Sequence, residues 1–105
     1  MGNCIIYCSV PNEFTADLIA TTLIDEKLAA CINVLPKMKS IYRWEDSIQR
    51  DEELLMIIKT QSSKFNIIEQ KIKELHEYSL PEIIAVPIIA GSSEYIQWIN
   101  NETNA

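Results

Sequence analysis

The chain has 105 residues, of which 48% are hydrophobic and 23% are charged, and its formal net charge at pH 7 is −6. This length fits one domain over residues 1–105, with enough apolar residues for a core that needs neither a disulfide nor a structural metal. The negative charge argues against a nucleic-acid partner and against an anionic membrane surface. No segment approaches the roughly 20 apolar residues that span a bilayer.

The N-terminal residues and the number of cysteines indicate in which compartment the protein is found. Residues 1–6 carry no basic residue ahead of the first apolar run, which is not the pattern of a secretory signal. Three cysteines are an odd number without paired spacing, which fits a reducing environment. We therefore expect a cytoplasmic protein.

The first third of the chain predicts a strand, a helix and a second strand. Residues 4–8 are apolar and rich in β-formers, so we expect a buried strand there. A helix over 13–27 follows, with Asn12 as its N-cap and apolar residues at helical spacing. The next strand begins at Cys31 and is interrupted by Pro36.

A long β-hairpin is expected between residues 38 and 60. Alternation places Met38, Ser40, Tyr42 and Trp44 on one face of its first strand, and Ile41 and Arg43 on the other. Residues 45–47 form the expected turn, and residues 48–60 return as the second strand. The charged residues of this region read as solvated hairpin surface: Arg43, Glu45, Asp46, Arg50, Asp51, Glu52 and Glu53.

The remainder of the chain predicts a helix, a strand and a short terminal helix. Ser62 or Ser63 is expected to cap the first of these helices, whose inner stripe is Phe65, Ile68, Ile72 and Leu75. Residues 82–89 read as a strand in which Pro87 marks an edge or a bulge. The last helix carries Tyr95, Ile96, Trp98 and Ile99, and the polar tail over 100–105 is expected to fray.

This order, β-α-β-β-α-β with a terminal helix, is the α+β ferredoxin-like arrangement, in which two helices cover one face of an antiparallel sheet. Residues 31–44 would extend roughly 46 Å if straight, whereas a domain of this size has a radius of gyration of about 13 Å. The hairpin must therefore bend at Pro36 or project beyond the domain.

The outer part of the hairpin carries apolar residues that are costly to leave in water: Met38, Ile41, Tyr42, Trp44 and Ile48. Either they fold back onto their own sheet, or another copy of the chain covers them. We favour a self-complementary interface, which would also protect the exposed hairpin edge.

Two residues suggest a soft metal site. Cys8 lies at the exit of the first strand, whereas Cys4 and Cys31 read as small buried hydrophobes. His76, the one histidine, either interacts with the end of its helix or joins Cys8 in a site suited to copper or zinc. Two ligands are too few for a tight site, so a third would come from Glu77, a neighbouring subunit or water.

No enzymatic constellation is present. The sequence lacks a nucleophile–base pair, a phosphate-binding glycine loop and a nucleotide fingerprint, so we expect neither catalysis nor a required cofactor. Lys59, near the end of an apolar strand, could pair with Glu82 to line a site, although a plain surface ion pair is the simpler interpretation.

Five segments together resemble the CutA divalent-cation-tolerance family. In chain order they are Glu26–Asn33, Tyr42–Glu45, Glu53–Thr60, His76–Ile83 and Tyr95–Ile99. The resemblance covers about residues 4 to 99 and implies a ferredoxin-like subunit in a homotrimer assembled partly through the long hairpin. It also implies a role in divalent-metal tolerance, with copper held at positions that match Cys8 and His76.

The sequence departs from the family pattern at four positions. Leu75 stands where some members have a second histidine, Glu77 stands where the family has a proline, and Ser79 stands where the family has an acidic or amide residue. Asp46 replaces a glycine that is common in the hairpin turn. The fold implied by the resemblance should tolerate these changes, whereas the metal site loses one of its ligands.

The sequence therefore supports three functional hypotheses. The first is a cytoplasmic homotrimer associated with copper tolerance that binds metal weakly. The second is a trimeric signalling module similar to the PII regulators, which would bind a small anion between subunits through Lys59, Tyr78 and Glu82. The third is a trimeric scaffold for partner proteins.

Overall fold

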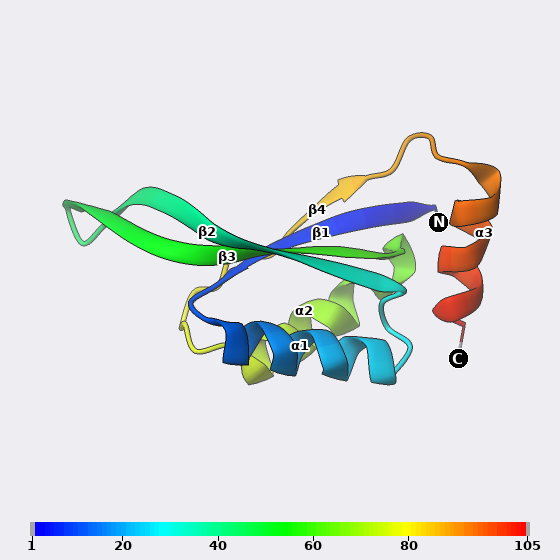
Figure 1. Ribbon diagram of the computed structural model, residues 1–105, viewed down its shortest axis with the longest axis horizontal. Coiled ribbons are helices and arrows are strands. Elements are labelled where there is room, and N and C mark those ends of the chain that lie inside the picture. The colour runs from blue at the N-terminus through cyan, green and yellow to red at the C-terminus, as the bar shows by residue number, and fades with distance from the viewer. Residues whose placement is uncertain (1, 105) are drawn as a thin grey trace.

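The computed structural model describes residues 2–104, and its elements follow the predicted order. The strands are β1 (Asn3–Val10), β2 (Cys31–Trp44), β3 (Ser47–Gln61) and β4 (Ile84–Pro87). The helices are α1 (Glu13–Asp25), the short 3₁₀ turn η1 (Ser62–Lys64), α2 (Phe65–Leu75) and α3 (Ser93–Glu102). The sheet is antiparallel with strand order β2-β3-β1-β4, and α1 and α2 lie on one side of it (Figure 1). The predicted ferredoxin-like α+β fold is confirmed.

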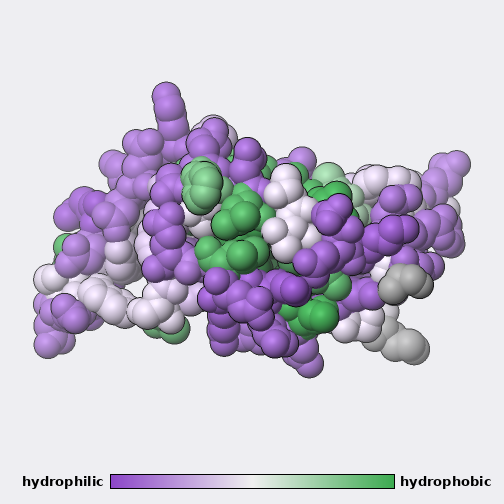
Figure 2. Space-filling model, turned by 90° about the horizontal axis from the view of Figure 1, so that it is seen from below, coloured by the Kyte–Doolittle hydropathy of each residue, from purple (hydrophilic) through white to green (hydrophobic). Residues whose placement is uncertain are grey.

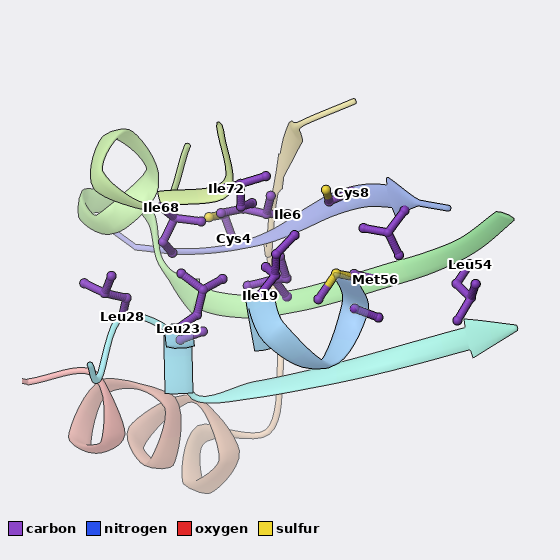
Figure 3. Packing of buried hydrophobic residues seen from close by; sticks show 14 residues of the cluster. Cys4, Ile6, Cys8, Ile19, Leu23, Leu28, Leu54, Met56, Ile68 and Ile72 are labelled. Carbon is purple, nitrogen blue, oxygen red and sulfur yellow. The ribbon is translucent and has the colours of Figure 1, made fainter. Parts of the chain in front are cut away.

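The hydrophobic core lies between the sheet and these two helices. Alternate residues of β1 and β3, such as Ile6 and Met56, point towards the helices and are buried. They meet Ile19 of α1 and the predicted stripe of α2, of which Ile68 and Ile72 are fully buried (Figure 3). Asn12 caps α1 as predicted, because its side-chain oxygen accepts a hydrogen bond from the Thr15 amide at 2.9 Å.

The other side of the sheet, here called the open face, is also rich in apolar residues. Strand alternation and register place the following side chains on it: Ile5, Tyr7, Leu35, Leu55, Ile57, Ile84 and Val86. Helix α3 lies beside one end of the sheet, where Asn100 and Thr103 bond to Asn3 and Gln61 (Figure 1). Leu35 and Ile84 remain 49% and 52% exposed. The open face is therefore an uncovered apolar surface.

The helix-covered side has a different character. Figure 2 shows it as mainly polar, with apolar side chains gathered near its centre. Exposed apolar residues of α1 and α2 on this side of the molecule include Phe14, Leu18 and Ile67. Among residues 2–104, no helix is both long enough and apolar enough to cross a bilayer.

A β-bulge in β2 lets the strand continue through Pro36. Leu35 pairs with Leu55 and Met38 pairs with Glu53, so β2 advances three residues while β3 advances two. The extra residue is accommodated because Lys37 has φ +57°. In a regular strand, residues three apart point to opposite faces. Because of the bulge, Leu35 and Met38 both lie on the open face.

The hairpin projects from the body and does not fold back onto its own sheet (Figure 1). The molecule measures 45 × 25 × 22 Å, and its long axis follows the hairpin. The predicted alternation of its first strand is confirmed, because Met38, Ser40, Tyr42 and Trp44 follow the bulge in one register. Ile41 and Ile48 lie on the opposite face of this ribbon, so the predicted apolar set is divided between two faces.

Several predicted boundaries were wrong. Ser47 belongs to β3 and pairs with Trp44, so the turn contains only two residues. Neither Ser62 nor Ser63 caps α2, since both lie in the 3₁₀ turn and Lys64 precedes the helix without a side-chain cap. Helix α1 ends two residues early, and β4 keeps four residues of the predicted strand.

The C-terminal tail was also predicted wrongly over residues 100–104. Helix α3 continues to Glu102, and the hydroxyl of Thr103 donates to the Ile99 carbonyl at 2.8 Å while accepting from the Gln61 amide. Thr103 is fully buried, so these bonds hold the chain end against β3. Ala105 lies outside the described residues.

The hairpin turn stores strain that a substitution should release. Glu45 and Asp46 have φ of +50° and +65°, the combination of a type I′ turn, for which Asn-Gly is preferred. We expect the double substitution Glu45→Asn, Asp46→Gly to raise the free energy of unfolding by about 1 kcal/mol. Urea denaturation of both proteins measures this difference, and an unchanged or lower midpoint would argue against a strained turn.

Candidate functional site

The three residues after α2 tie together three separate parts of the fold. Nε2 of His76 lies 2.7 Å from the carbonyl oxygen of Ser9, at the end of β1. Nδ1 of the same ring accepts a hydrogen bond from the Tyr78 amide at 3.0 Å. Because Nδ1 accepts, Nε2 carries the proton and donates to Ser9. Both nitrogens of the buried imidazole therefore have hydrogen-bond partners.

Glu77 bonds to the start of α1. Its Oε2 accepts from the Thr15 hydroxyl at 2.6 Å and from the Asn12 side-chain amide at 3.2 Å. These two hydrogen bonds lower the pKa of Glu77, and the nearby His76 adds to the effect. The carboxylate also lies at the positive end of the helix dipole, which favours its charge.

Tyr78 reaches the base of the hairpin. Its hydroxyl donates to Oε2 of Glu53 at 2.8 Å, and burial together with this bond raises the pKa of Tyr78. Farther along the hairpin, Tyr42 donates to Asp51, a bond that raises the pKa of Tyr42. Two tyrosine–carboxylate pairs therefore follow one another along the same face.

Cys8 lies inside the core, on the helix side of β1 (Figure 3). Its thiol donates to the carbonyl oxygen of Ser9 at 3.7 Å, the same oxygen that His76 contacts. Burial raises the pKa of Cys8 to about 12, and the negative charges of Glu82 and Glu53 add to the rise. The fold thus brings Cys8 and His76 together around one carbonyl, but Cys8 is a protonated thiol at neutral pH.

The thiol of Cys8 and both ring nitrogens of His76 are engaged by groups of the protein itself. A metal ion needs the deprotonated thiolate and a free ring nitrogen, whereas the thiol is protonated and both nitrogens of His76 are bonded. Among residues 2–104, no group of three His, Cys, Asp or Glu side chains is placed to hold a metal ion. A metal could bind here only after displacing a proton and the contact with Ser9.

Lys59 lies apart from Tyr78 and Glu82. It is six residues beyond Glu53 on β3, roughly 20 Å away at the normal strand rise. Its ammonium group donates to the Asn33 side chain across the sheet. The structure therefore brings together Tyr78 and Glu82, but not Lys59.

Tyr78 and Glu82 line a groove of about 780 Å³ between the hairpin and the segment that follows α2. Its remaining lining residues are Ser9, Met38, Ser40, Ile41, Tyr42, Arg43, Trp44, Glu53, Glu77, Ser79 and Leu80. Four of the five residues predicted for the subunit interface are therefore also part of this groove, and Ile48 is not.

Sequence reasoning missed two features of this site. Glu53 was assigned to solvated hairpin surface, which was wrong, because it is only 6% exposed and pairs with Tyr78. The carbonyl of Ser9 joins Cys8 to His76, and a backbone acceptor leaves no signal in a sequence. The bulge that places Met38 opposite Glu53 could have been suspected from Pro36, which cannot donate to a strand ladder.

Known proteins match the chain over nearly its whole length. The sequence profile of the family described as CutA1 divalent ion tolerance protein matches residues 4–102. The chain is 41% identical over 99 residues to the divalent-cation tolerance protein CutA of Thermus thermophilus, covering 94% of this chain and 96% of that protein. It is also 41% identical to the chloroplastic CutA protein of Arabidopsis thaliana, of which it spans about half, 54%.

The fold matches as well. A solved structure named the periplasmic divalent cation tolerance protein CutA of Archaeoglobus fulgidus superposes with a TM-score of 0.95 at 38% identity. The superposition covers 97% of this chain and 99% of that one.

The state of Cys8 gives a testable result. Because its thiol is buried and protonated, we expect Cys8 to resist iodoacetamide in the folded protein at about pH 8 and to react in urea. Mass spectrometry of peptides measures the labelling, with Cys31 as the half-buried comparison. Rapid labelling of Cys8 without unfolding would contradict a protonated core thiol.

Glu77 should make stability depend on pH in the acidic range. Its pKa is lower in the folded protein than in the unfolded chain, so its contribution is complete above the unfolded value of about 4.3. That contribution is lost as pH falls through the lower folded value. We expect Glu77→Gln to destabilise the protein at neutral pH, with a difference from the unmodified protein that shrinks towards about pH 3.

Urea midpoints over this pH range test the Glu77 contribution. Glu52→Gln, at an exposed position of β3 away from any helix start, makes the same change of charge without such a contact and serves as the control. A Glu77→Gln difference that stays constant with pH would mean that the carboxylate is not stabilised by Thr15 and Asn12.

Proposed function

The chain belongs to the CutA1 divalent ion tolerance family, and we propose that it acts in divalent-cation tolerance as a cytoplasmic homotrimer, by binding and assembly and not by catalysis. The observation that carries this proposal is the apolar open face, which α1 and α2 leave uncovered because both pack on the opposite side.

The open face supports assembly on energetic grounds. Burying one large aliphatic side chain contributes about 1.5–3 kcal/mol, and this face offers several, including Leu35 and Ile84 at its two edge strands. Sheets pack face to face at about 10 Å when apolar side chains interdigitate. A neighbouring copy that presents the same kind of surface is a suitable cover.

The hairpin favours a ring over a two-fold dimer. Tyr42 and Trp44 lie on one face of the ribbon, and Ile41 and Ile48 lie on the other, all of them at least 42% exposed. Because exposed apolar side chains are costly in water, a ribbon that is apolar on both faces is stabilised when neighbouring copies contact both faces. In a closed ring each subunit meets two neighbours through two different surfaces, and three copies give the smallest such ring.

A metal role at Cys8 and His76 would be weak in this structure. A copper ion would have to displace the Cys8 proton and compete with the Ser9 carbonyl for the ring of His76. Each of these costs reduces affinity, and the first makes affinity depend on pH. We therefore propose weak copper binding, with the third ligand supplied by water or a neighbouring subunit.

The cytoplasmic location rests on three free cysteines in the described residues. The Archaeoglobus protein is named periplasmic, which is a statement about that protein alone. A non-catalytic role agrees with the state of the single histidine, whose two nitrogens are committed to Ser9 and Tyr78.

Assembly is tested by placing a charge on the open face. We expect Leu35→Lys and Ile84→Lys to convert the trimer to monomers, because each would bury an unpaired ammonium group between subunits. Light scattering during gel filtration measures the mass. Ile67→Lys, on the helix side and similarly exposed, is the matched control that should remain trimeric. A trimer in all three variants would place the interface elsewhere.

Copper binding should strengthen with pH if the Cys8 thiolate is a ligand. Loss of one proton predicts about a tenfold gain in affinity per pH unit below the thiol pKa. Native mass spectrometry with near-stoichiometric copper measures occupancy, and Cys8→Ala should abolish it. The same occupancy in Cys8→Ala and His76→Ala would remove these residues from the site, and Cys31→Ala controls for binding by other thiols.

A further inference from the structure

The outer side of α1 carries apolar side chains where a surface helix usually carries polar ones. Ala16, Ile19 and Leu23 form the inner stripe of the helix and are buried in the core. Phe14 and Leu18, four residues apart, lie on the opposite side of the helix, and Phe14 is 75% exposed. Adjacent apolar side chains on the solvent side of a helix indicate a surface that another molecule covers.

An open hollow continues this apolar stripe towards the C-terminal end of α1. Its volume is about 610 Å³, and its apolar walls come from Ala20 and Ile24 of the helix and from Ile32 of β2. Thr21 and Thr22 also line it, and their hydroxyl groups donate to carbonyl oxygens of the preceding helical turn, both at 2.7 Å. These hydroxyls are satisfied within the helix, so an apolar group can enter the hollow without leaving them unpaired.

The ionisable side chains of α1 are all acidic. Glu13, Asp17 and Asp25 belong to the helix and Glu26 follows it, whereas the helix contains no lysine, arginine or histidine. Glu26 pairs with Lys71 of α2 at 3.3 Å, but Asp17 and Asp25 form no ion pair within residues 2–104. Asp25 and Glu26 also lie at the negative end of the helix dipole, which disfavours a carboxylate. A positively charged partner would relieve this repulsion.

The charge of this surface determines which partner can cover it. A second copy of α1 would bring like charges together, and an anionic membrane would be repelled for the same reason. Lys27 follows the helix but does not line the hollow. A basic amphipathic helix can place apolar side chains against Phe14 and Leu18 and in the hollow, while its basic side chains reach the two aspartates. Helix α1 is about 20 Å long, so a partner helix of three to four turns would cover it.

We propose that the outer side of α1 is a docking surface for a basic amphipathic helix of another protein. The apolar side chains of that helix pack on Phe14, Leu18 and the hollow, and its lysines or arginines pair with Asp17 and Asp25. Because α1 lies on the side of the sheet opposite the open face, assembly through the open face leaves this surface exposed (Figure 1). The inference goes beyond cation tolerance and requires neither a metal nor a neighbouring subunit.

The probe for this surface is a fluorescein-labelled peptide of about 14 residues, made of leucine, alanine and lysine, whose leucines form one stripe of a helix. A scrambled peptide keeps the charge without the stripe, and a peptide with glutamate in place of lysine reverses the charge. Fluorescence anisotropy measures binding. We expect one lysine peptide to bind each chain with a dissociation constant of about 0.1 mM or lower, and both control peptides to bind at least about tenfold more weakly.

Two kinds of variant locate the contact on α1. Phe14→Ser and Leu18→Ser remove the apolar stripe at exposed positions, and each should weaken binding by about tenfold. Asp17→Lys and Asp25→Lys should each weaken binding of the lysine peptide by about fivefold and strengthen binding of the glutamate peptide. Glu102→Lys makes the same change of charge at the exposed end of α3 and should bind as the unmodified protein does.

Ile89→Ser, at a position after β4 that is 94% exposed, controls for the loss of an apolar side chain and should leave binding unchanged. The monomer expected from Leu35→Lys should bind with the same affinity per chain, because each subunit carries the complete surface. Loss of binding in that variant would place the contact between subunits and overturn the proposal. An absence of saturable binding, equal binding of the scrambled peptide, or unchanged affinity in both serine variants or in both lysine variants of α1 would overturn it as well.

Discussion

Helices α1 and α2 pack on the same face of the sheet, so the opposite face is left without a covering layer. On the helix side of β1 and β3, the two helices bury Ile6, Met56 and their neighbours. The open face carries nearly as many apolar side chains but receives only the end of α3. Since the chain leaves this face uncovered, we propose that it forms one assembly surface together with the projecting hairpin and the apolar edge strand β4.

The segment after α2 connects the core to the base of the projecting hairpin through hydrogen bonds. His76, Glu77 and Tyr78 bind in turn to the end of β1, the start of α1 and the base of the hairpin. The family resemblance implies a proline at position 77, and a proline would restrict the backbone there. In this chain the hydrogen bonds of the Glu77 side chain hold the segment, so they restrict the backbone where a proline ring would otherwise do so.

The fold was predictable because its signals are local. Alternation in β1, the spacing of Ile68 and Ile72 in α2, and the cap at Asn12 each indicate one element without reference to the others. The two-residue turn was missed because Glu45 and Asp46 are not the residues that a type I′ turn prefers. The frayed tail was predicted wrongly because Thr103 is held by Gln61, a contact between distant parts of the chain.

The candidate site was less predictable than the fold because it depends on contacts between distant parts of the chain. Cys8 and His76 could be picked out by residue type, but their protonation and contacts depend on burial and on the Ser9 carbonyl. Glu53 belongs to a run of charges, and its burial depends on the bulged register that sets it opposite Met38 on the open face and on its hydrogen bond from Tyr78. Residue chemistry can be read from a sequence, whereas the environment that sets its pKa or its partners cannot.

The mass of the unmodified protein in solution tests the central claim most directly. Sedimentation equilibrium over a range of falling concentrations would measure it. If the open face is an interface between copies, the mass should be three times the 12.0 kDa of the chain and should hold at low concentration. A stable monomer of 12.0 kDa would show that the open face tolerates water and would contradict the account.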